Sequence, residues 1–140
     1  MRKRLWRTIS ILLCLSMICS ISAYAAVARA SSRISVCSAT LLKKSNGDLS
    51  LTNSIVAAGI MDNLGASSVV IERYNGNKWV EEQTYSFSDT PELQTSGENR
   101  YTVTLVITPQ YADSNYRAEV TFYAEDSFGS NTKPVTTNTV

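Results

Sequence analysis

Two segments in the second half of the chain alternate apolar and polar residues with a period of two, and this pattern constrains the fold more than any other feature. In residues 100–108 one face carries Tyr101, Val103, Leu105 and Ile107, and the other carries Thr102, Thr104, Val106 and Thr108. In residues 116–125 one face carries Tyr116, Ala118, Val120, Phe122 and Ala124, against Arg117, Glu119, Thr121, Tyr123 and Glu125. A period of two is that of a β-strand, whereas a helix repeats every 3.6 residues. The pattern predicts two central antiparallel strands, each with one face on a core and one in water.

Two Asn-Gly pairs predict hairpins in the first half of the chain. Asn46-Gly47 lies between the strand candidates 33–44 and 49–58, and Asn75-Gly76 lies between the candidates 67–74 and 78–84. Asn-Gly supplies the positive φ angles of a type I′ turn, so we expect this turn type in both hairpins.

The remaining segments complete an all-β pattern. Residues 132–140 form a last short strand, and Pro134 places it at a sheet edge. Residues 61–65 are expected to connect two strands through one helical turn, and the polar residues 85–99 form the longest loop. Seven strands at short spacing predict an antiparallel, immunoglobulin-like β-sandwich, with residues 31–140 as a single domain.

The first thirty residues have the composition of a secretory signal peptide. Basic residues at positions 2–7 precede an apolar stretch at 9–21, and small residues follow. Signal peptidase accepts small side chains at −3 and −1, so Ala23 and Ala25 suit cleavage after residue 25. Two later registers, the last ending at Ala30, also fit. An uncleaved membrane anchor is the alternative, because residues 8–28 are uncharged and about 20 apolar residues span a bilayer.

Cleavage changes the charge balance and the cysteine chemistry of the chain. Five of the 13 basic residues and none of the 12 acidic residues lie in positions 1–30, which leaves a net charge of −4, or −3 if cleavage after residue 25 retains Arg29. This balance argues against nucleic acid and anionic membranes as partners. Cys37 is then the one remaining cysteine, so no intramolecular disulfide is expected. Its side chain either packs as a small apolar group or bridges to another molecule.

The run Tyr-Arg-Ala-Glu-Val-Thr-Phe-Tyr-Ala-Glu-Asp-Ser-Phe-Gly at 116–129 resembles strand F of fibronectin type III and other immunoglobulin-like domains, which reads Tyr-x-x-x-Val-x-Ala-x-Asn-x-x-Gly. The spacing departs by two residues, and Asp126 stands at the Asn position. The resemblance implies that Tyr116 is a corner tyrosine. The immunoglobulin cysteine pair and the tryptophan of the third strand are missing.

Residues 58–67, 75–79 and 116–129 also resemble small secreted proteins of Gram-positive bacteria that form a family of uncharacterised function. This resemblance extends over roughly residues 31–135. It implies a secreted β-sandwich and brings no catalytic residue with it.

Residues that carry acid–base or metal chemistry are few. The chain has no histidine, which excludes Ser-His-Asp and Cys-His arrangements and imidazole metal ligands. The carboxylates occur as the pairs Glu81/Glu82, Asp89/Glu92 and Glu125/Asp126. Adjacent strand residues point to opposite faces, so Glu81 and Glu82 cannot act on one bond. We expect these groups to be solvated surface charges and predict no catalytic residue.

Two loops offer oxygen ligands for calcium. Asp62 with Asn63 and Asp126 with Asn131 are the candidates, but the chain lacks the Asp-x-Asp-x-Asp-Gly pattern of a calcium loop. Turn formation explains the same residues, so we predict neither a metal nor a cofactor.

Aromatic residues form the candidate binding site. Tyr74, Trp79 and Tyr85 surround the second hairpin, and Tyr123 lies on the water-facing side of its strand. Exposed aromatic rings stack on sugars or anchor protein partners. The alternative, which we favour for Trp79, is cross-strand packing against Tyr74 or Val80.

These features together predict a secreted, non-catalytic binding module that acts outside the cell or at its surface, with an unknown protein or glycan partner. Two alternatives remain open. A structural or self-assembling matrix component would use exposed sheet edges or a Cys37 bridge, and a small glycan hydrolase would need two carboxylates across a cleft.

Overall fold

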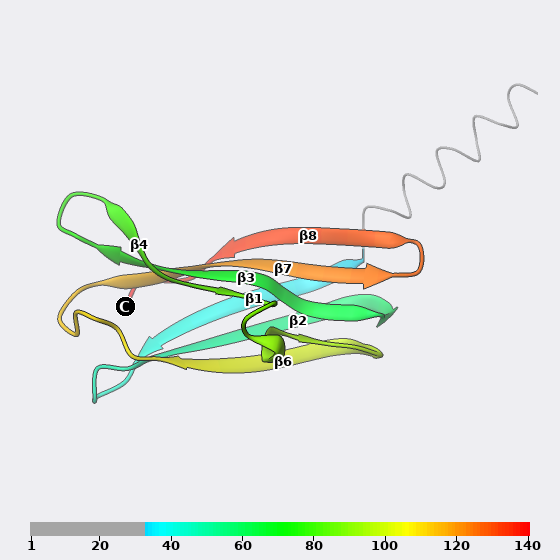
Figure 1. Cartoon of the computed structure of the whole chain (residues 1–140), viewed down its shortest axis with the longest axis horizontal. Helices are drawn as coiled ribbons and strands as arrows, with labels where there is room; N and C mark the ends of the chain where they lie inside the picture. The colour runs from blue at the N-terminus through cyan, green and yellow to red at the C-terminus, as the bar shows by residue number, and fades with distance from the viewer. Residues whose placement is uncertain (1–32) are drawn as a thin grey trace, which may run out of the picture. The chain divides into compact units, whose positions relative to one another are not determined.

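The computed structural model describes residues 33–140, which fold into two packed antiparallel sheets (Figure 1). The elements are β1 (Ile34–Lys43), β2 (Leu49–Met61), β3 (Asn63–Tyr74), β4 (Trp79–Ser86), the 3-10 helix η1 (Pro91–Leu93), β5 (Gln94–Thr95), β6 (Glu98–Ile107), β7 (Tyr116–Asp126) and β8 (Gly129–Thr136). The expected signal peptide and its cleavage sites lie outside these residues. Within residues 33–140, no helix is long and apolar enough to cross a membrane.

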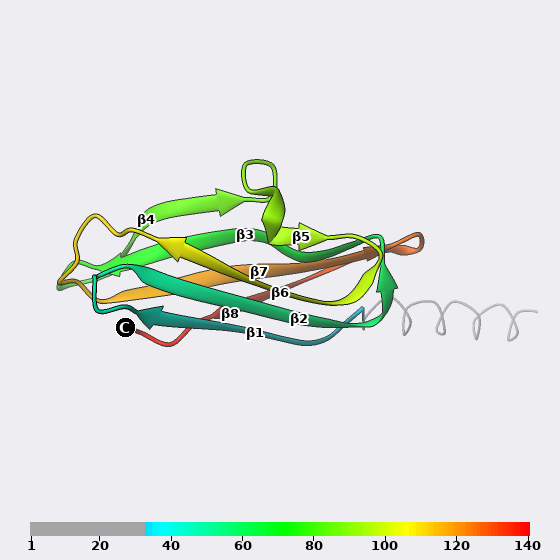
Figure 2. The same ribbon diagram turned by 90° about the horizontal axis from the view of Figure 1, so that it is seen from below.

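The strand order confirms the predicted all-β, immunoglobulin-like sandwich. One sheet has three strands in the order β1-β2-β6, and the other has the order β4-β3-β7-β8, with the short β5 added beside β3 (Figures 1 and 2). Seven of the strands correspond to the seven predicted segments, and β5 is an additional strand of two residues. In the lettering of immunoglobulin-like domains, the two sheets are ABE and GFCC′.

The core lies between the sheets and contains the residues that the alternating pattern predicted to face inward. Fully or almost fully buried side chains include Leu49, Leu51, Ile55, Val69, Ile71, Leu105, Ile107, Tyr116, Ala118, Val120, Phe122 and Ala124. Tyr101 and Val103 are partly buried against them. Each large apolar side chain in this set contributes roughly 1.5–3 kcal/mol through removal from water. Residues 33–140 form one compact unit that contains both sheets and this core.

The connection at residues 61–65 is not helical, contrary to the prediction. β2 ends at Met61, and β3 begins two residues later at Asn63. Neighbouring segments take the backbone groups of this corner: the Asp62 N–H donates to the Glu125 carbonyl (2.7 Å), and the Gly97 N–H donates to the Met61 carbonyl (2.9 Å). Residues 63–65 are likewise paired with β7, and the chain passes directly from one sheet to the other.

Both predicted hairpins are present, but their turns are not of type I′. That turn needs positive φ at both central residues, and among residues 33–140 only glycines have positive φ. The Gly47 N–H (φ 91°) donates to the Lys44 carbonyl, which fits a three-residue loop closed by a glycine bulge. In the second turn the Asn75 side-chain oxygen accepts from two following backbone N–H groups. Asparagine shapes this turn through its side chain.

Residues 85–99 are more ordered than the single long loop that the sequence predicts. β4 extends to Ser86, and η1 and β5 follow before β6 begins. Leu93 at the end of η1 is fully buried and fixes this segment to the core. Gly65 in β3 permits the close approach, since a Cβ atom there would lie 2.1 Å from the Leu93 carbonyl oxygen.

The C-terminal segment covers one side of the sandwich. Among the described strands β8 pairs only with β7, which confirms the predicted edge position of Pro134. Beyond β8, Val140 and Tyr116 exchange two backbone hydrogen bonds (2.8 and 2.9 Å). The Asn138 side chain accepts from the N–H of Leu41 in β1 (3.2 Å) and donates to its carbonyl (3.0 Å). This amide therefore satisfies edge groups that would otherwise be open to another strand.

Candidate functional site

Tyr74 and Trp79 come together on the outer face of the five-stranded sheet, at the β3–β4 hairpin. They are directly paired across the two strands, and their ring centroids lie 5.3 Å apart at 55°. The predicted cross-strand packing is therefore confirmed. Tyr74 retains 38% of its accessible surface, and Trp79 is half-buried. The two rings pack against each other, and part of each ring remains open to solvent.

Two charged residues complete this cluster. The Arg117 guanidinium lies 4.4 Å from the centroid of the Trp79 ring, a cation–π arrangement. Its Nε also donates to the Glu72 carboxylate at 2.6 Å. The four residues Glu72, Tyr74, Trp79 and Arg117, here called the hairpin patch, hold one another in fixed orientations. A patch ordered before binding loses less side-chain entropy when a partner arrives.

The other two predicted binding residues lie apart from this patch. Tyr85 packs against the core on the inner side of β4, and its hydroxyl donates to Gln83 (2.6 Å). The expected grouping of Tyr85 with Trp79 on one face is thus wrong. A register shift between β3 and β4 lies between these two residues, so Tyr85 turns to the inner face and pairs with the buried Val69. Tyr123 shares the outer face with Arg117 but lies six residues further along β7, roughly 20 Å away at about 3.4 Å per residue.

Glu82 is buried, which corrects the expectation that it is a solvated surface charge. The register between β3 and β4 pairs Ile71 with Gln83 and Glu72 with Glu81, so Glu82 is the extra residue of a bulge. Its side chain is only 7% exposed. The carboxylate accepts hydrogen bonds from Arg73 (3.1 Å), the backbone of Gln110 (2.8 Å) and the Tyr116 hydroxyl (3.0 Å). The sequence contains no signal for this network, since a bulge cannot be located without the pairing register.

Tyr116 occupies the position implied for a corner tyrosine. Its hydroxyl accepts from the Tyr111 N–H (3.2 Å) and lies 3.1 Å from the Tyr111 carbonyl oxygen, five residues upstream. Burial and the neighbouring Glu82 raise the pKa of Tyr116 to about 12. Arg73 completes the cluster by lying 4.1 Å from the Tyr111 ring centroid. The group ties the β6–β7 loop to both β4 and β7.

Three other carboxylates of the predicted pairs have separate local partners. Glu81 accepts from the Thr84 hydroxyl (2.7 Å) on the face opposite to Glu82, as predicted. Asp89 accepts from Ser86 in the turn after β4. Glu125 accepts from Asn63 (2.7 Å) at the β2–β3 corner.

Arg33 lies where the sequence suggested calcium ligands. Its guanidinium is 2.8 Å from the Asp126 carboxylate and donates to the Asn131 side-chain oxygen at 3.2 Å. Hydrogen bonding from Arg33 holds the pKa of Asp126 below its usual value. A cation of the chain itself therefore occupies these oxygens. Asn63, the other candidate, turns its amide toward Glu125.

Cys37 is half-buried on the inner side of β1 and packs against the edge of the core. Burial raises the pKa of its thiol, although the nearby Lys133 opposes this shift. The thiol form is thus favoured, and the residue behaves as a small apolar group.

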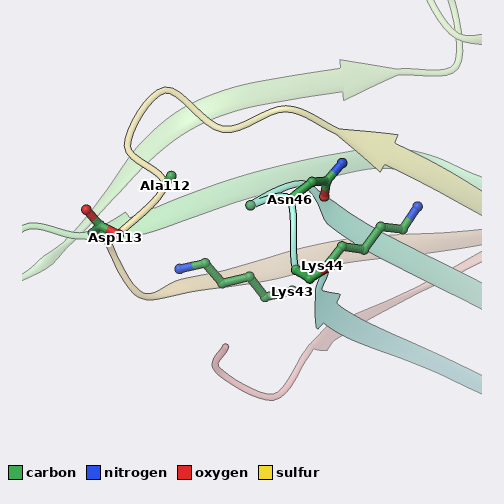
Figure 3. A pocket seen from close by; sticks show the side chains of 7 residues that line it. Lys43, Lys44, Asn46, Ala112 and Asp113 are labelled. Carbon is green, nitrogen blue, oxygen red and sulfur yellow. The ribbon is translucent and has the colours of Figure 1, made fainter.

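A hollow of about 660 Å³ lies at the end of the sandwich, between the β1–β2 turn and the β6–β7 loop. Figure 3 shows Lys43 and Lys44 extending from it in opposite directions. Lys43 already donates to the Ser114 carbonyl (3.1 Å). The lining is made of turn residues and brings together no set of groups for chemistry.

Comparison with protein-family models, with curated proteins and with solved structures finds no match to this chain.

Proposed function

We propose that this protein is a secreted, non-catalytic binding module whose binding surface is the hairpin patch. One observation carries the proposal: Trp79, Tyr74 and Arg117 gather on an accessible sheet face. Tryptophan, tyrosine and arginine are the residue types most enriched among the side chains that dominate binding energy. Their mutual contacts fix their orientations, which favours recognition without a conformational change.

The carboxylates support a role without catalysis. A glycan hydrolase needs two carboxyl groups facing one bond across a cleft, with one of them free to give a proton. The buried carboxylate of Glu82 instead accepts from an arginine, a tyrosine and a backbone N–H. Glu81 beside it points to the opposite face. These geometries favour structural roles for both groups.

The partner that we propose is an extracellular protein or a glycan. Arg117 covers one side of the Trp79 ring, and Tyr74 is tilted against it, so the exposed remainder of this aromatic pair is the contact surface. Glu72, paired with Arg117, adds a polar rim. An apolar centre with a polar rim is the usual anatomy of a binding interface.

The binding test compares two variants, one in which Trp79 is truncated to alanine and one in which Phe128 is. Labelled protein starting at residue 26 is titrated against wall and matrix fractions of the producing cells and against a panel of purified glycans. We expect Trp79→Ala to weaken the strongest interaction at least about 30-fold, equivalent to about 2 kcal/mol. Phe128→Ala is the control, because Phe128 is a 91% exposed aromatic at the tip of another hairpin. Equal losses in both variants would contradict a specific role for the patch.

Stability must be measured on the same variants. Trp79→Ala removes an aromatic pair worth about 0.5–1.5 kcal/mol beyond burial and an exposed cation–π contact worth about 0.5–1 kcal/mol. It also exposes what the half-buried ring removes from water, roughly half of the 1.5–3 kcal/mol of a fully buried side chain. We therefore expect a loss of roughly 2–4 kcal/mol, which leaves the domain folded. A larger loss would identify Trp79 as a core residue and would remove the basis for the binding proposal.

Secretion is a separate part of the proposal, and it rests on the sequence of residues 1–30. The mature chain is expected in the culture medium with Ala26 as its first residue, or Ser31 after the later cleavage. Mass spectrometry of the N-terminal peptide decides between them. Membrane-bound protein that keeps residues 1–25 would refute secretion without affecting the hairpin patch.

A further inference from the structure

The outer face of the three-stranded sheet carries hydroxyl groups in an ordered grid. The register aligns its side chains in four rows across β1, β2 and β6: Val36–Val56–Arg100, Ser38–Ser54–Thr102, Thr40–Thr52–Thr104 and Leu42–Ser50–Val106. We call these twelve positions the hydroxyl face. Hydrogen bonds join Thr52 to Thr104 (3.1 Å) and Ser54 to Thr102 (3.0 Å). The two middle rows therefore consist only of serine and threonine, and each end row has two aliphatic residues, with Arg100 or Ser50 as the third.

This face is almost uncharged and yet exposed. Arg100, at one corner, is the only charged residue among its twelve positions. An ordinary solvated surface with about 25–35% charged residues would place three or four charges there. Three of the four aliphatic side chains are open to solvent, with exposed fractions of 61% for Val36 and 59% for both Leu42 and Val106, and Val56 on the central strand is partly buried. A face depleted in charge, with exposed aliphatic groups, has the composition of an interface.

The order of the rows is self-complementary. A symmetric dimer places a patch against a copy of itself related by a two-fold axis. If that axis lies in the face, either along or across the strands, the two hydroxyl rows meet hydroxyl rows, and the mostly aliphatic end rows meet end rows. A hydroxyl both donates and accepts, so such rows can pair with their own copies. The two Arg100 side chains never face each other. Arg100 lies against Val36 of the copy if the axis runs along the strands, and against Val106 if it runs across them. We propose that the hydroxyl face joins two copies of this chain in a symmetric dimer.

The area of the face predicts a weak, reversible dimer. Three strands about 4.8 Å apart and seven residues at about 3.4 Å each give a grid of roughly 14 by 24 Å. This is smaller than the ~800 Å² per partner that a standard stable interface buries. The dimer therefore forms only at high protein concentration or where copies are held close together.

The dimer leaves both hairpin patches accessible, since the patch lies on the outer face of the opposite sheet. Two copies joined in this way present two binding surfaces that face away from each other. A partner with repeated sites would then be bound by both, with an avidity above that of a single patch. The dimer itself does not depend on the proposed binding function.

Sedimentation equilibrium on the chain from residue 26 tests the dimer between about 1 µM and 1 mM, the range in which weak complexes dissociate. We expect the mass to rise from that of one chain toward that of two. Thr52→Lys places two lysines against each other near the two-fold axis and should weaken association at least about 100-fold. Thr121→Lys is the matched control: this threonine also lies outward on a central strand, but on the opposite sheet. It should associate like the unchanged protein.

Three outcomes would overturn the proposal. The unchanged chain could remain monomeric up to 1 mM, as it would if the hydroxyl face binds a neutral glycan instead. Thr52→Lys could associate normally, or Thr121→Lys could weaken association as strongly. Circular dichroism checks that each variant is folded, and Ser38→Lys on the exposed edge strand replaces Thr52→Lys if that variant unfolds. Trp79→Ala should leave dimerisation unchanged, so failure of the binding proposal and failure of the dimer are separate results.

Discussion

Replacing Asn53 with leucine is expected to stabilise the protein, although it removes a polar residue from the middle of a central strand. Asn53 lies in β2, paired with Ala39 and Val103, and is 98% buried between the sheets. Within residues 33–140, neither its side-chain oxygen nor its nitrogen has a hydrogen-bond partner. A buried polar group without a partner costs roughly 1–3 kcal/mol, because it gives up its hydrogen bonds to water and receives none in return.

Leucine suits this position because its side chain branches at the same atom as asparagine. The change removes the desolvation cost of the amide, but the methyl groups are larger than the atoms they replace, and the resulting strain offsets part of the gain in stability. We expect a net increase of about 1–2 kcal/mol in the free energy of unfolding. Asn53→Asp is the opposing variant, since it buries an unpaired charge and should unfold the domain.

Urea denaturation followed by circular dichroism measures both variants. The midpoint for Asn53→Leu should rise while the slope with urea stays unchanged, which indicates altered stability without an altered unfolded state. A loss of more than about 1 kcal/mol in a folded Asn53→Leu protein would refute the reasoning. That result would mean that the amide makes hydrogen bonds whose value exceeds the cost of burial.

Three further predictions follow from the packing. Gly65→Ala should destabilise the domain by more than about 2 kcal/mol in a thermal melt, because the new Cβ atom meets the Leu93 carbonyl oxygen and the backbone φ is +153°. Gly59→Ala is the control: a Cβ atom there has open space, so the stability should not change. Val120→Asp should unfold the domain, while Glu119→Ala should change the free energy of unfolding by less than about 0.5 kcal/mol; similar effects would contradict the observed register. The raised pKa of Tyr116 means that the folded state favours the neutral phenol. The contribution of the Tyr116 hydroxyl to the free energy of unfolding is therefore complete below the ordinary tyrosine pKa of about 10 and is lost as pH rises toward 12. The difference in stability between the unchanged protein and Tyr116→Phe, measured in urea titrations, should narrow over this range.

The strands of this sandwich were predictable because one face of each is buried and the other is not. Leu105 and Ile107, or Val120 and Phe122, can be assigned to the core from alternation alone, since one core-facing side requires a period of two. The Asn-Gly pairs also located both hairpins. They did not determine the turn type, because a glycine with positive φ serves a three-residue loop as well as a type I′ turn.

Register and bulges account for what the sequence could not predict. Glu82 turns inward because one extra residue in β4 lies opposite β3, and no local pattern marks that insertion. Tyr85 follows the same shift onto the inner face. The hydroxyl face depends on pairing between strands that are about fifty residues apart, such as Thr52 with Thr104. Trp79 with Tyr74 was predictable, because a short hairpin brings neighbours in sequence directly opposite each other.

The anchoring of the two ends of the domain has a mechanical consequence. Arg33 is bound by Asp126 and Asn131 beside the β7–β8 hairpin, and Val140 is paired with Tyr116 at the opposite end of the sandwich (Figure 1). A pull between these two anchors runs along the strands, across hydrogen bonds that are perpendicular to them. Those bonds share the load in shear and must break together, whereas a sideways pull would open them one after another. Stretched along its length, the domain should therefore bear far more force than when it is peeled apart.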